Sequence, residues 1–210
     1  MLPNYYRAHL DSMAKNLRAF PWHDRYAYGM YIAQTYYYVC HSVRLLATAA
    51  GRMTMEDNSS HKRFLTHIRE ESGHEVMARR DLEELGFTLE DFPELPETRM
   101  FWETQYYKIE HIDPLSLMGY ILALEAIACE QCPWITQELK KSFPNNAHTF
   151  MRVHGEEDPD HVAKAWEQIS ALPPARLKAV VENFEQTAVG LNNILNGVMR
   201  RMVEKVSAAA

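Results

Sequence analysis

Acidic residues and histidines recur at helical spacing in two segments of the chain. The octapeptide HGEEDPDH, which starts at His154, places His154, Asp158 and His161 at positions i, i+4 and i+7. On an α-helix such positions lie within roughly 60° of one another, so the three side chains share one face. Glu71 and His74 stand at i and i+3 in an earlier segment. Carboxylates and imidazoles placed in this way indicate a site for divalent metal ions.

A further acid lies inside a strongly apolar segment. Glu125 stands in the middle of GYILALEAIA, where an ionised carboxylate loses its hydration unless another group compensates it. No lysine or arginine occurs between Lys108 and Lys140, so a cationic partner must come from another helix or be a metal ion. We therefore expect Glu125 to face the same centre as the two segments above.

The candidate ligands form a set of three carboxylates and three neutral imidazoles. Oxygen and nitrogen donors with a summed charge of −3 suit two divalent iron ions with open coordination positions, and manganese is the next choice. Structural zinc sites use four tetrahedral ligands and commonly include cysteine, which this set lacks. The six candidate ligands are Glu71, His74, Glu125, His154, Asp158 and His161.

The spacing of these ligands differs from that of ferritin-like di-iron proteins. Those proteins use a lone Glu, a Glu-x-x-His pair, a second lone Glu and a second pair, on four helices. This chain nearly fills three of the four slots, with an Asp in the last pair, but the segment from Asp24 to Gly51, where the first lone Glu belongs, contains no glutamate. The chain carries instead an extra histidine, His154, one turn before Asp158.

The elements that position these residues are predicted to be helices throughout. Apolar residues recur at helical spacing, and the eight glycines and ten prolines fall mostly between such stretches. Capping residues and prolines mark the boundaries of seven or eight helices. They run from about Asn4 to Phe20, from Asp24 to Gly51, from Asn58 to Gly86, from Glu97 to Glu110, from Asp113 through LSLMGYILALEAIACEQC, from Pro144 through HGEEDPDH to Pro173-Pro174, and from Ala175 to Val206.

Length and composition indicate one domain that acts on small molecules or proteins. The 210 residues suffice for a single core, so one domain over residues 1–210 is expected. A net charge of −6 disfavours nucleic acid, three cysteines cannot form a disulfide framework, and no apolar run approaches the length of a membrane span. The N-terminal segment mixes charged and apolar residues, so the expected location is the cytoplasm. The oligomeric state stays open, with a homodimer as one possibility.

Three sequence motifs resemble the heme-oxygenase-like di-iron oxidases, also described as iron-containing redox enzymes. They are EESGHEVMARRDLEELG, GYILALEAIA and HGEEDPDHV, and the segment YIAQTYYYVCHSVRLLATAAGR resembles the Gln- and Tyr-rich helix of that family. The resemblance implies a heme-oxygenase-like bundle of seven to eight helices, related in fold to thiaminase II and pyrroloquinoline quinone synthase. It also implies two Fe(II) ions per chain on the six residues above, with His67 and Glu70 as reserve candidates.

The resemblance implies an enzyme with O2 as co-substrate. The reactions in such a family include N-oxygenation and oxidative C–C cleavage of amino-acid- or fatty-acid-like molecules. A metal-free enzyme of the thiaminase II or pyrroloquinoline quinone synthase type, and a metal-binding scaffold without turnover, are the alternatives. Tyr31, Gln34, Tyr38 and His41 share a helical stripe and are weaker candidates for lining a substrate pocket. Cys129 and Cys132 are expected to pack in the core.

The proline within the octapeptide predicts a local break. Pro159 disfavours helical geometry at Asp158 and removes a backbone donor. The acids around it repel one another, and iron would neutralise them. We therefore expect metal to help order this segment.

Overall fold

The computed structural model describes residues 4–143, 146–156 and 159–209, without the side chains at positions 159–161, 164, 206, 208 and 209. Within these residues all regular structure is helical, so the prediction of an all-α fold is confirmed. The α-helices are α1 (Asn4–Ala19), α2 (Arg25–Val39), α3 (Ser42–Arg52), α4 (Asn58–Glu71), α5 (His74–Glu84), α6 (Pro96–His111), α7 (Leu117–Ser142), α8 (Thr149–Gly155), α9 (Pro159–Ser170) and α10 (Pro174–Ala209). Short 3-10 helices are η1 (Met55–Asp57), η2 (Leu89–Asp91) and η3 (Pro114–Ser116).

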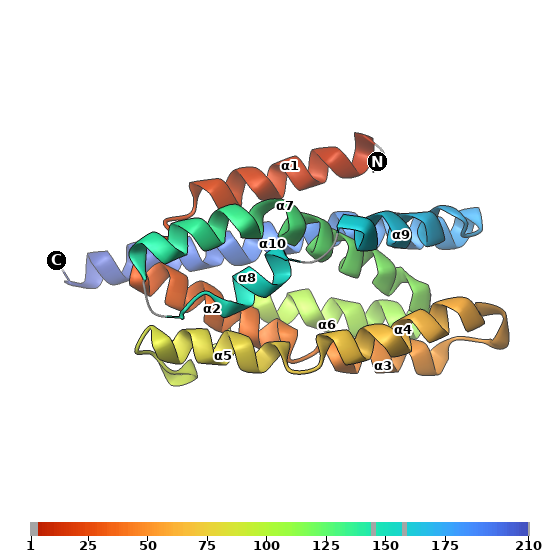
Figure 1. Ribbon diagram of the computed structural model, residues 1–210, viewed down its shortest axis with the longest axis horizontal. Coiled ribbons are helices and arrows are strands. Elements are labelled where there is room, and N and C mark those ends of the chain that lie inside the picture. The colour runs from red at the N-terminus through yellow and green to blue at the C-terminus, as the bar shows by residue number, and fades with distance from the viewer. Residues whose placement is uncertain (1–3, 144–145, 157–158, 210) are drawn as a thin grey trace.

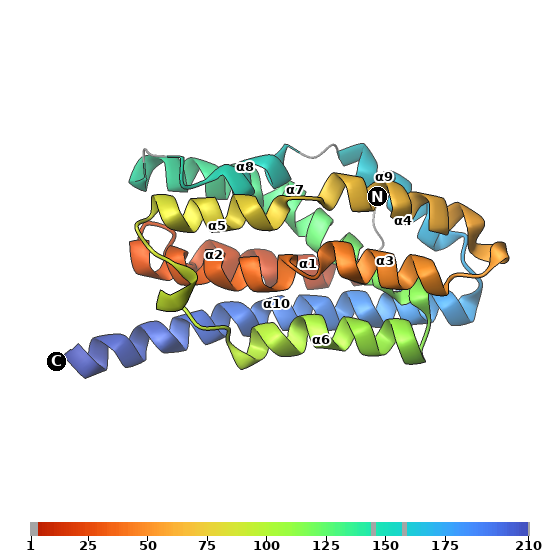
Figure 2. The ribbon, with the colours of Figure 1, turned by 90° about the horizontal axis from the view of Figure 1, so that it is seen from below.

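The helices form an elongated bundle whose long axes run roughly parallel (Figure 1). The apolar α7 packs against α10 on one side and α8 on another. Helices α2 and α3 follow one another as one broken rod, and α4 and α5 form a second rod beside it, with α2 against α5 and α3 against α4 (Figure 2). The last turns of α10 extend beyond the rest of the bundle in both views.

Three of the predicted helices are each divided into two. The helix expected from Asp24 to Gly51 is interrupted at Cys40 and His41, where no glycine or proline marks the break. The helix expected from Asn58 to Gly86 is interrupted before Gly73, whose φ of +97° lies in the left-handed region. The helix expected through HGEEDPDH consists of α8 and α9, while Asp158 lies outside the described residues. The junction between α2 and α3 and the junction between α4 and α5 lie near the middle of the bundle (Figure 2).

The most apolar helix is the core of the bundle. The stretch Pro114–Ser142 is long and apolar enough, by length and composition alone, to cross a membrane. Of its most apolar window, 67% is buried inside the protein, as expected for a central core helix. Residues such as Leu122, Ala123 and Leu139 are completely buried in it. This helix carries Glu125 into the interior.

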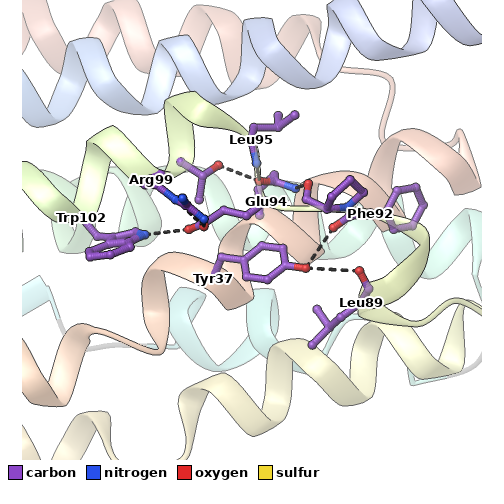
Figure 3. Close-up of polar contacts among 10 residues, drawn as sticks. Tyr37, Leu89, Phe92, Glu94, Leu95, Arg99 and Trp102 are labelled. Atoms are coloured by element: carbon purple, nitrogen blue, oxygen red, sulfur yellow. Dashed lines mark hydrogen bonds and ion pairs between the residues drawn. The ribbon is translucent and has the colours of Figure 1, made fainter.

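A network of satisfied polar groups joins α2 to the segment that leads into α6 (Figure 3). The side-chain oxygen of the fully buried Gln34 accepts hydrogen bonds from the Leu95 N–H and the Thr98 hydroxyl, both at 2.8 Å. Its amide nitrogen donates to the Pro93 carbonyl at 3.2 Å. The Tyr37 hydroxyl lies within hydrogen-bond distance of two further carbonyl oxygens, of η2 and the residue after it, at 3.2 and 3.1 Å. Gln34 therefore fixes α6 relative to α2.

Charged and aromatic groups extend this network along the surface. The Glu94 carboxylate accepts from the Arg99 guanidinium at 2.9 Å and from the Trp102 indole N–H at 2.7 Å (Figure 3). The Trp102 ring stacks on His41, with centroids 3.7 Å apart. His41 also makes a 3.1 Å hydrogen bond with the Tyr106 hydroxyl. The break between α2 and α3 is thus packed against α6.

Candidate active site

Two carboxylates from different helices converge on one imidazole inside the bundle. The Nε2 atom of His67 lies 3.3 Å from Glu71 Oε1 and 3.3 Å from Glu125 Oε1. The second oxygen of Glu71 lies 3.3 Å from His74 Nδ1. The side chains of Glu71 and Glu125 are only 16% and 14% exposed. These four residues, from α4, α5 and α7, are the centre of a buried ionisable cluster.

His154 of α8 completes the described part of this cluster. Its ring centroid lies 4.6 Å from that of His74, at an interplanar angle of 71°, and it stacks on Phe150 at 4.0 Å. Its Nδ1 lies 2.8 Å from the Phe150 carbonyl oxygen. A carbonyl oxygen only accepts, so Nδ1 carries the proton and Nε2 carries the lone pair. A second hydrogen bond of this kind orients metal-binding histidines in proteins.

Two of the six predicted ligands cannot be placed. Asp158 lies outside the described residues, and so does the side chain of His161, whose backbone belongs to α9. Within the part of the chain that the structure describes, no group of three or more His, Cys, Asp or Glu side chains has an arrangement that could hold a metal ion. The four other predicted ligands lie together in the cluster, and His67 lies between its two acids.

The cluster holds its groups in defined protonation states. Burial alone would raise the pKa of Glu71, but hydrogen bonds from His67 and His74 keep this pKa well below its ordinary value. Burial would lower the pKa of His67, but the hydrogen bond with Glu71 and the charge of Glu125 leave it raised. Burial lowers the pKa of His154. At neutral pH, therefore, Glu71 is an anion and His154 is neutral, which are the forms that bind metals.

The break between α4 and α5 places Glu71 and His74. Glu71 is the last residue of α4 and His74 the first of α5. Between them Gly73 adopts a φ of +97°, a conformation that side-chain-bearing residues rarely adopt. The two side chains therefore meet across a turn instead of along one continuous helix.

A buried aspartate holds the start of α8. The two oxygens of Asp81, on α5, accept hydrogen bonds from the backbone N–H groups of Thr149 at 3.0 Å and Phe150 at 2.8 Å. These are unpaired donors of a helix N-terminus, which a carboxylate satisfies well. Burial raises the pKa of Asp81 to about 6 despite these bonds. Asp81 thereby fixes the helix that carries His154.

The cluster forms a polar part of the wall of a cavity of about 110 Å³. His67, Glu71, Glu125 and His154 all contribute to its wall. Away from them the wall is mainly apolar and comes from α1, α2, α3, α7, α8 and α10. It includes Leu17, Tyr31, Tyr38, Leu45, Leu46, Leu117, Tyr120, Ile121, Leu124, Ile127, Ala128, Cys132, Ile135, Phe150, Met151 and Leu191.

The four weaker pocket candidates, three on α2 and His41 directly before α3, separate into two pairs. Tyr31 and Tyr38 line the cavity. Gln34 and His41 are not among its lining residues and instead make the contacts with the α6 side described above. Positions three apart on a helix differ in direction by about 60°, and α2 is buried on more than one side. Residues of the predicted stripe can therefore face either the cavity or α6.

The sequence analysis missed several cavity residues. Tyr120 was not singled out, and Cys132 was expected only to pack in the core. Cys132 does pack, with its sulfur 3.7 Å from that of Met151, but it also lines the cavity. It lies seven positions after Glu125, two turns along the same helical face. The shared face with Glu125 was visible in the sequence, but it was interpreted as core packing alone.

Comparisons with known proteins agree with this architecture. A domain of unknown function with a heme oxygenase-like fold from Shewanella denitrificans OS217 superposes with a TM-score of 0.81, at 20% identity over 93% of this chain and 90% of that one. A TenA homologue from Pseudomonas syringae pv. tomato DC3000 gives 0.78 at 11% identity, over 94% and 90%. A TenA homologue from Pyrococcus furiosus gives 0.71 at 12% identity, over 92% and 99%. The fold is therefore a heme-oxygenase-like helical bundle.

The sequence itself places the chain in one family of that fold. Residues 30–201 match the family described as iron-containing redox enzymes, and the protein belongs to this family. The resemblance inferred from the three motifs is thereby confirmed. A search of curated proteins finds no match.

Proposed function

We propose that the protein is a non-heme di-iron oxidase that uses O2 to oxidise a small organic molecule. The observation that carries the proposal is the convergence of Glu71 and Glu125, from two helices, on the same imidazole beside His74 and His154. Membership of the family of iron-containing redox enzymes supports the same chemistry. A mainly apolar cavity that this cluster helps to line provides a place for the substrate.

The donor chemistry of the cluster fits iron. Glu71 is held as a carboxylate, and the tautomer of His154 leaves Nε2 as a ligand atom. Oxygen and nitrogen donors of this kind suit Fe(II). Glu71, His74, Glu125 and His154 would hold two ions together with Asp158 and His161, the two predicted ligands outside the described side chains.

Each part of the site has a role in the proposed reaction. Bound iron would supply the activation of O2, for N-oxygenation or oxidative C–C cleavage. The acids provide the negative charge that retains the metal, and Phe150 orients His154 through its carbonyl group. The apolar walls exclude water and hold the hydrophobic part of an amino-acid- or fatty-acid-like substrate.

Iron titration tests this proposal. Iron-free protein is titrated with Fe(II) without oxygen and then exposed to O2 while oxygen consumption and visible absorption are followed. We expect about two ions per chain, O2 uptake and a transient absorption band. Glu71→Gln should abolish these signals, whereas Glu70→Gln provides the matched control. Glu70 is the preceding residue, is exposed, and pairs with Arg63 at the surface.

Other outcomes of the titration contradict the oxidase. Stable iron without O2 uptake would identify a metal-binding scaffold. Absence of iron binding would favour a metal-free enzyme of the thiaminase II type. For that alternative the relevant observation is Cys132, since its thiol lines the cavity and offers a nucleophile. Cys132→Ala should then abolish turnover, whereas in the oxidase it should leave iron binding intact.

A further inference from the structure

Three buried tyrosine hydroxyls have no hydrogen-bond partner within the described residues. They belong to Tyr6, Tyr28 and Tyr120. Of the three, Tyr120 alone is among the residues that line the main cavity. The Tyr6 ring packs on Trp166 and Phe184, and the Tyr28 ring stacks on Phe143. Tyr120 is therefore the tyrosine in this group with access to a bound molecule.

Tyr120 belongs to the wall of the cavity that Glu71 and Glu125 also line. The residue is 4% exposed, and its ring lies against Phe101 with centroids 5.2 Å apart. Burial raises the pKa of Tyr120 well above its ordinary value, and the nearby Tyr38 and Glu71 add to this effect. Both of these neighbours also line the cavity. The hydroxyl is thus a neutral donor on a side chain that lines the same cavity as the acidic cluster.

A buried hydroxyl without an acceptor is unfavourable. Leaving such a group unpaired reduces the stability of the folded protein, because the hydroxyl loses its hydrogen bonds to water. A phenylalanine would fill the same space without this cost, and the ring already packs as a phenylalanine would. A ligand that brings an acceptor oxygen to this position would recover the lost interaction on binding.

We propose that the Tyr120 hydroxyl is a substrate-binding group that donates a hydrogen bond to an acceptor oxygen of the ligand. The ligand class is then a molecule whose carbonyl, carboxylate or amide oxygen lies beside Tyr120 in the cavity that Glu71 also lines. Its apolar part extends along the wall formed by α7 and α2, toward Tyr31 and Cys132. This assignment rests on the proposed function in identifying the ligand as the substrate, but the binding itself requires no iron.

Two isosteric probes test the hydrogen bond directly. Cyclohexanone carries an acceptor oxygen, whereas methylenecyclohexane has nearly the same shape and a CH2 group in its place. A neutral ketone avoids repulsion by Glu71 and Glu125 in iron-free protein. Kd values for both probes are measured by NMR titration on chelator-treated protein, for the wild type, Tyr120→Phe and Tyr28→Phe. The last is a matched control, a completely buried tyrosine outside the cavity.

The expected result is selective loss of ketone binding. Tyr120→Phe should weaken cyclohexanone binding by about tenfold and leave methylenecyclohexane unchanged or tighter. Tyr28→Phe should change neither Kd. The midpoint of thermal unfolding of iron-free Tyr120→Phe should equal or exceed that of the wild type, because no protein hydrogen bond is removed.

Three results would overturn the assignment. The first is that the ratio of the two Kd values is the same in the wild type and in Tyr120→Phe. The second is that the wild type binds neither probe saturably. The third is a marked fall in the midpoint of thermal unfolding of Tyr120→Phe. Since iron is absent from these measurements, they are independent of the oxidase test. If the wild type binds the ketone selectively but shows no iron-dependent O2 uptake, the Tyr120 assignment holds and the proposed oxidase function is wrong.

Discussion

The two polar regions on either side of α2 differ in how their buried groups are satisfied. On the α6 side the amide of Gln34 makes three hydrogen bonds of 2.8 to 3.2 Å with neutral partners (Figure 3). On the cavity side the acids Glu71 and Glu125 lie 3.3 Å from one shared imidazole nitrogen, and the Tyr120 hydroxyl has no hydrogen-bond partner within the described residues. The first region has short bonds between matched groups, and the second concentrates negative charge.

This difference is the one expected between a structural network and the proposed metal site. Neutral hydrogen bonds between buried groups hold elements together, and removal of one partner leaves the other unsatisfied. Two carboxylates in an apolar interior oppose folding unless a cation or proton compensates them. Substitutions on the α6 side should therefore mainly reduce stability, whereas replacement of Glu125 in the cluster should mainly reduce function.

The largest expected effect is that of Glu125→Leu on iron binding. Loss of one carboxylate from the proposed metal centre should weaken iron binding by at least about 100-fold and abolish O2 uptake. The free energy of unfolding of iron-free protein should fall by less than about 2 kcal/mol, because loss of the contact with His67 is offset by removal of a charge from an apolar segment. Iron titration and urea unfolding measure the two quantities. Unchanged iron binding together with a large loss of stability would show that Glu125 has a structural role and does not bind metal.

Gln34→Ala provides the opposite test on the other side of α2. It leaves the Leu95 N–H and the Thr98 hydroxyl without their acceptor, so the free energy of unfolding should fall by about 3 kcal/mol. Urea unfolding measures this change. Gln137→Ala, at an exposed position of α7, is the control and should change stability by less than about 0.5 kcal/mol. If Gln34→Ala has normal stability but binds iron more weakly, Gln34 belongs to the functional region and the distinction between the two sides of α2 is wrong.

The sequence predicts the helical class, and α9 begins at Pro159, where a break was expected, but the ends of α2 and α4 were not predicted. Helix ends at Pro21 and Gly86 follow from residues that stop helices, and the structure ends α1 and α5 just before them. The break at Cys40 and His41 carries no such residue. It depends on packing of His41 against Trp102, a contact between residues that are far apart in the sequence. Local propensity contains no information about that contact.

The candidate site shows the same division. Helical spacing grouped Glu71 with His74, and the apolar surroundings singled out Glu125, so the convergence of these three residues was predictable. The position of His67 between the two acids was not, because it depends on how α4 and α7 pack. Tyr120 was missed for a different reason. A tyrosine in an apolar helix has an ordinary sequence pattern, and only three-dimensional packing shows its unpartnered hydroxyl.

Asp81 shares features of both regions, because it is a buried ionisable group like the cluster acids but its hydrogen bonds hold a helix in place, as those of Gln34 do. Its pKa is raised from 3.8 to about 6 by burial, so the native state binds this proton more tightly than the unfolded chain. Its contribution to the free energy of unfolding is therefore fully present below about pH 4 and declines as the pH rises to about 6. The decline is about 2–3 kcal/mol. Asp81→Asn should remove this pH dependence of the free energy of unfolding.

Urea unfolding at a series of pH values measures the Asp81 effect. The difference in stability between wild type and Asp81→Asn should change by the amount above between about pH 4 and 6. Asp11→Asn is the control at an exposed ion pair, and its difference from the wild type should vary by less than about 1 kcal/mol. A difference for Asp81→Asn that is constant with pH would show that this carboxyl group is not perturbed by burial.

The smallest expected effect concerns Gly73, the turn that brings Glu71 and His74 together. A methyl group at this position would meet no atom within 4 Å, so the cost of Gly73→Ala comes from its φ of +97° alone. The free energy of unfolding should fall by about 1 kcal/mol. Gly51 is the matched control, since it also has open space around it but lies within α3.

Gly51→Ala should leave stability unchanged or raise it by up to about 1 kcal/mol, because alanine favours the helix. Urea unfolding of the two variants therefore gives changes of opposite sign if the left-handed turn is retained in solution. Iron titration of Gly73→Ala adds a second readout. Strain at this turn should displace Glu71 relative to His74 and weaken iron binding, whereas Gly51→Ala should bind iron as the wild type does. If both variants gain stability, α4 and α5 form one continuous helix in solution, and the two ligands are then placed by helical spacing alone.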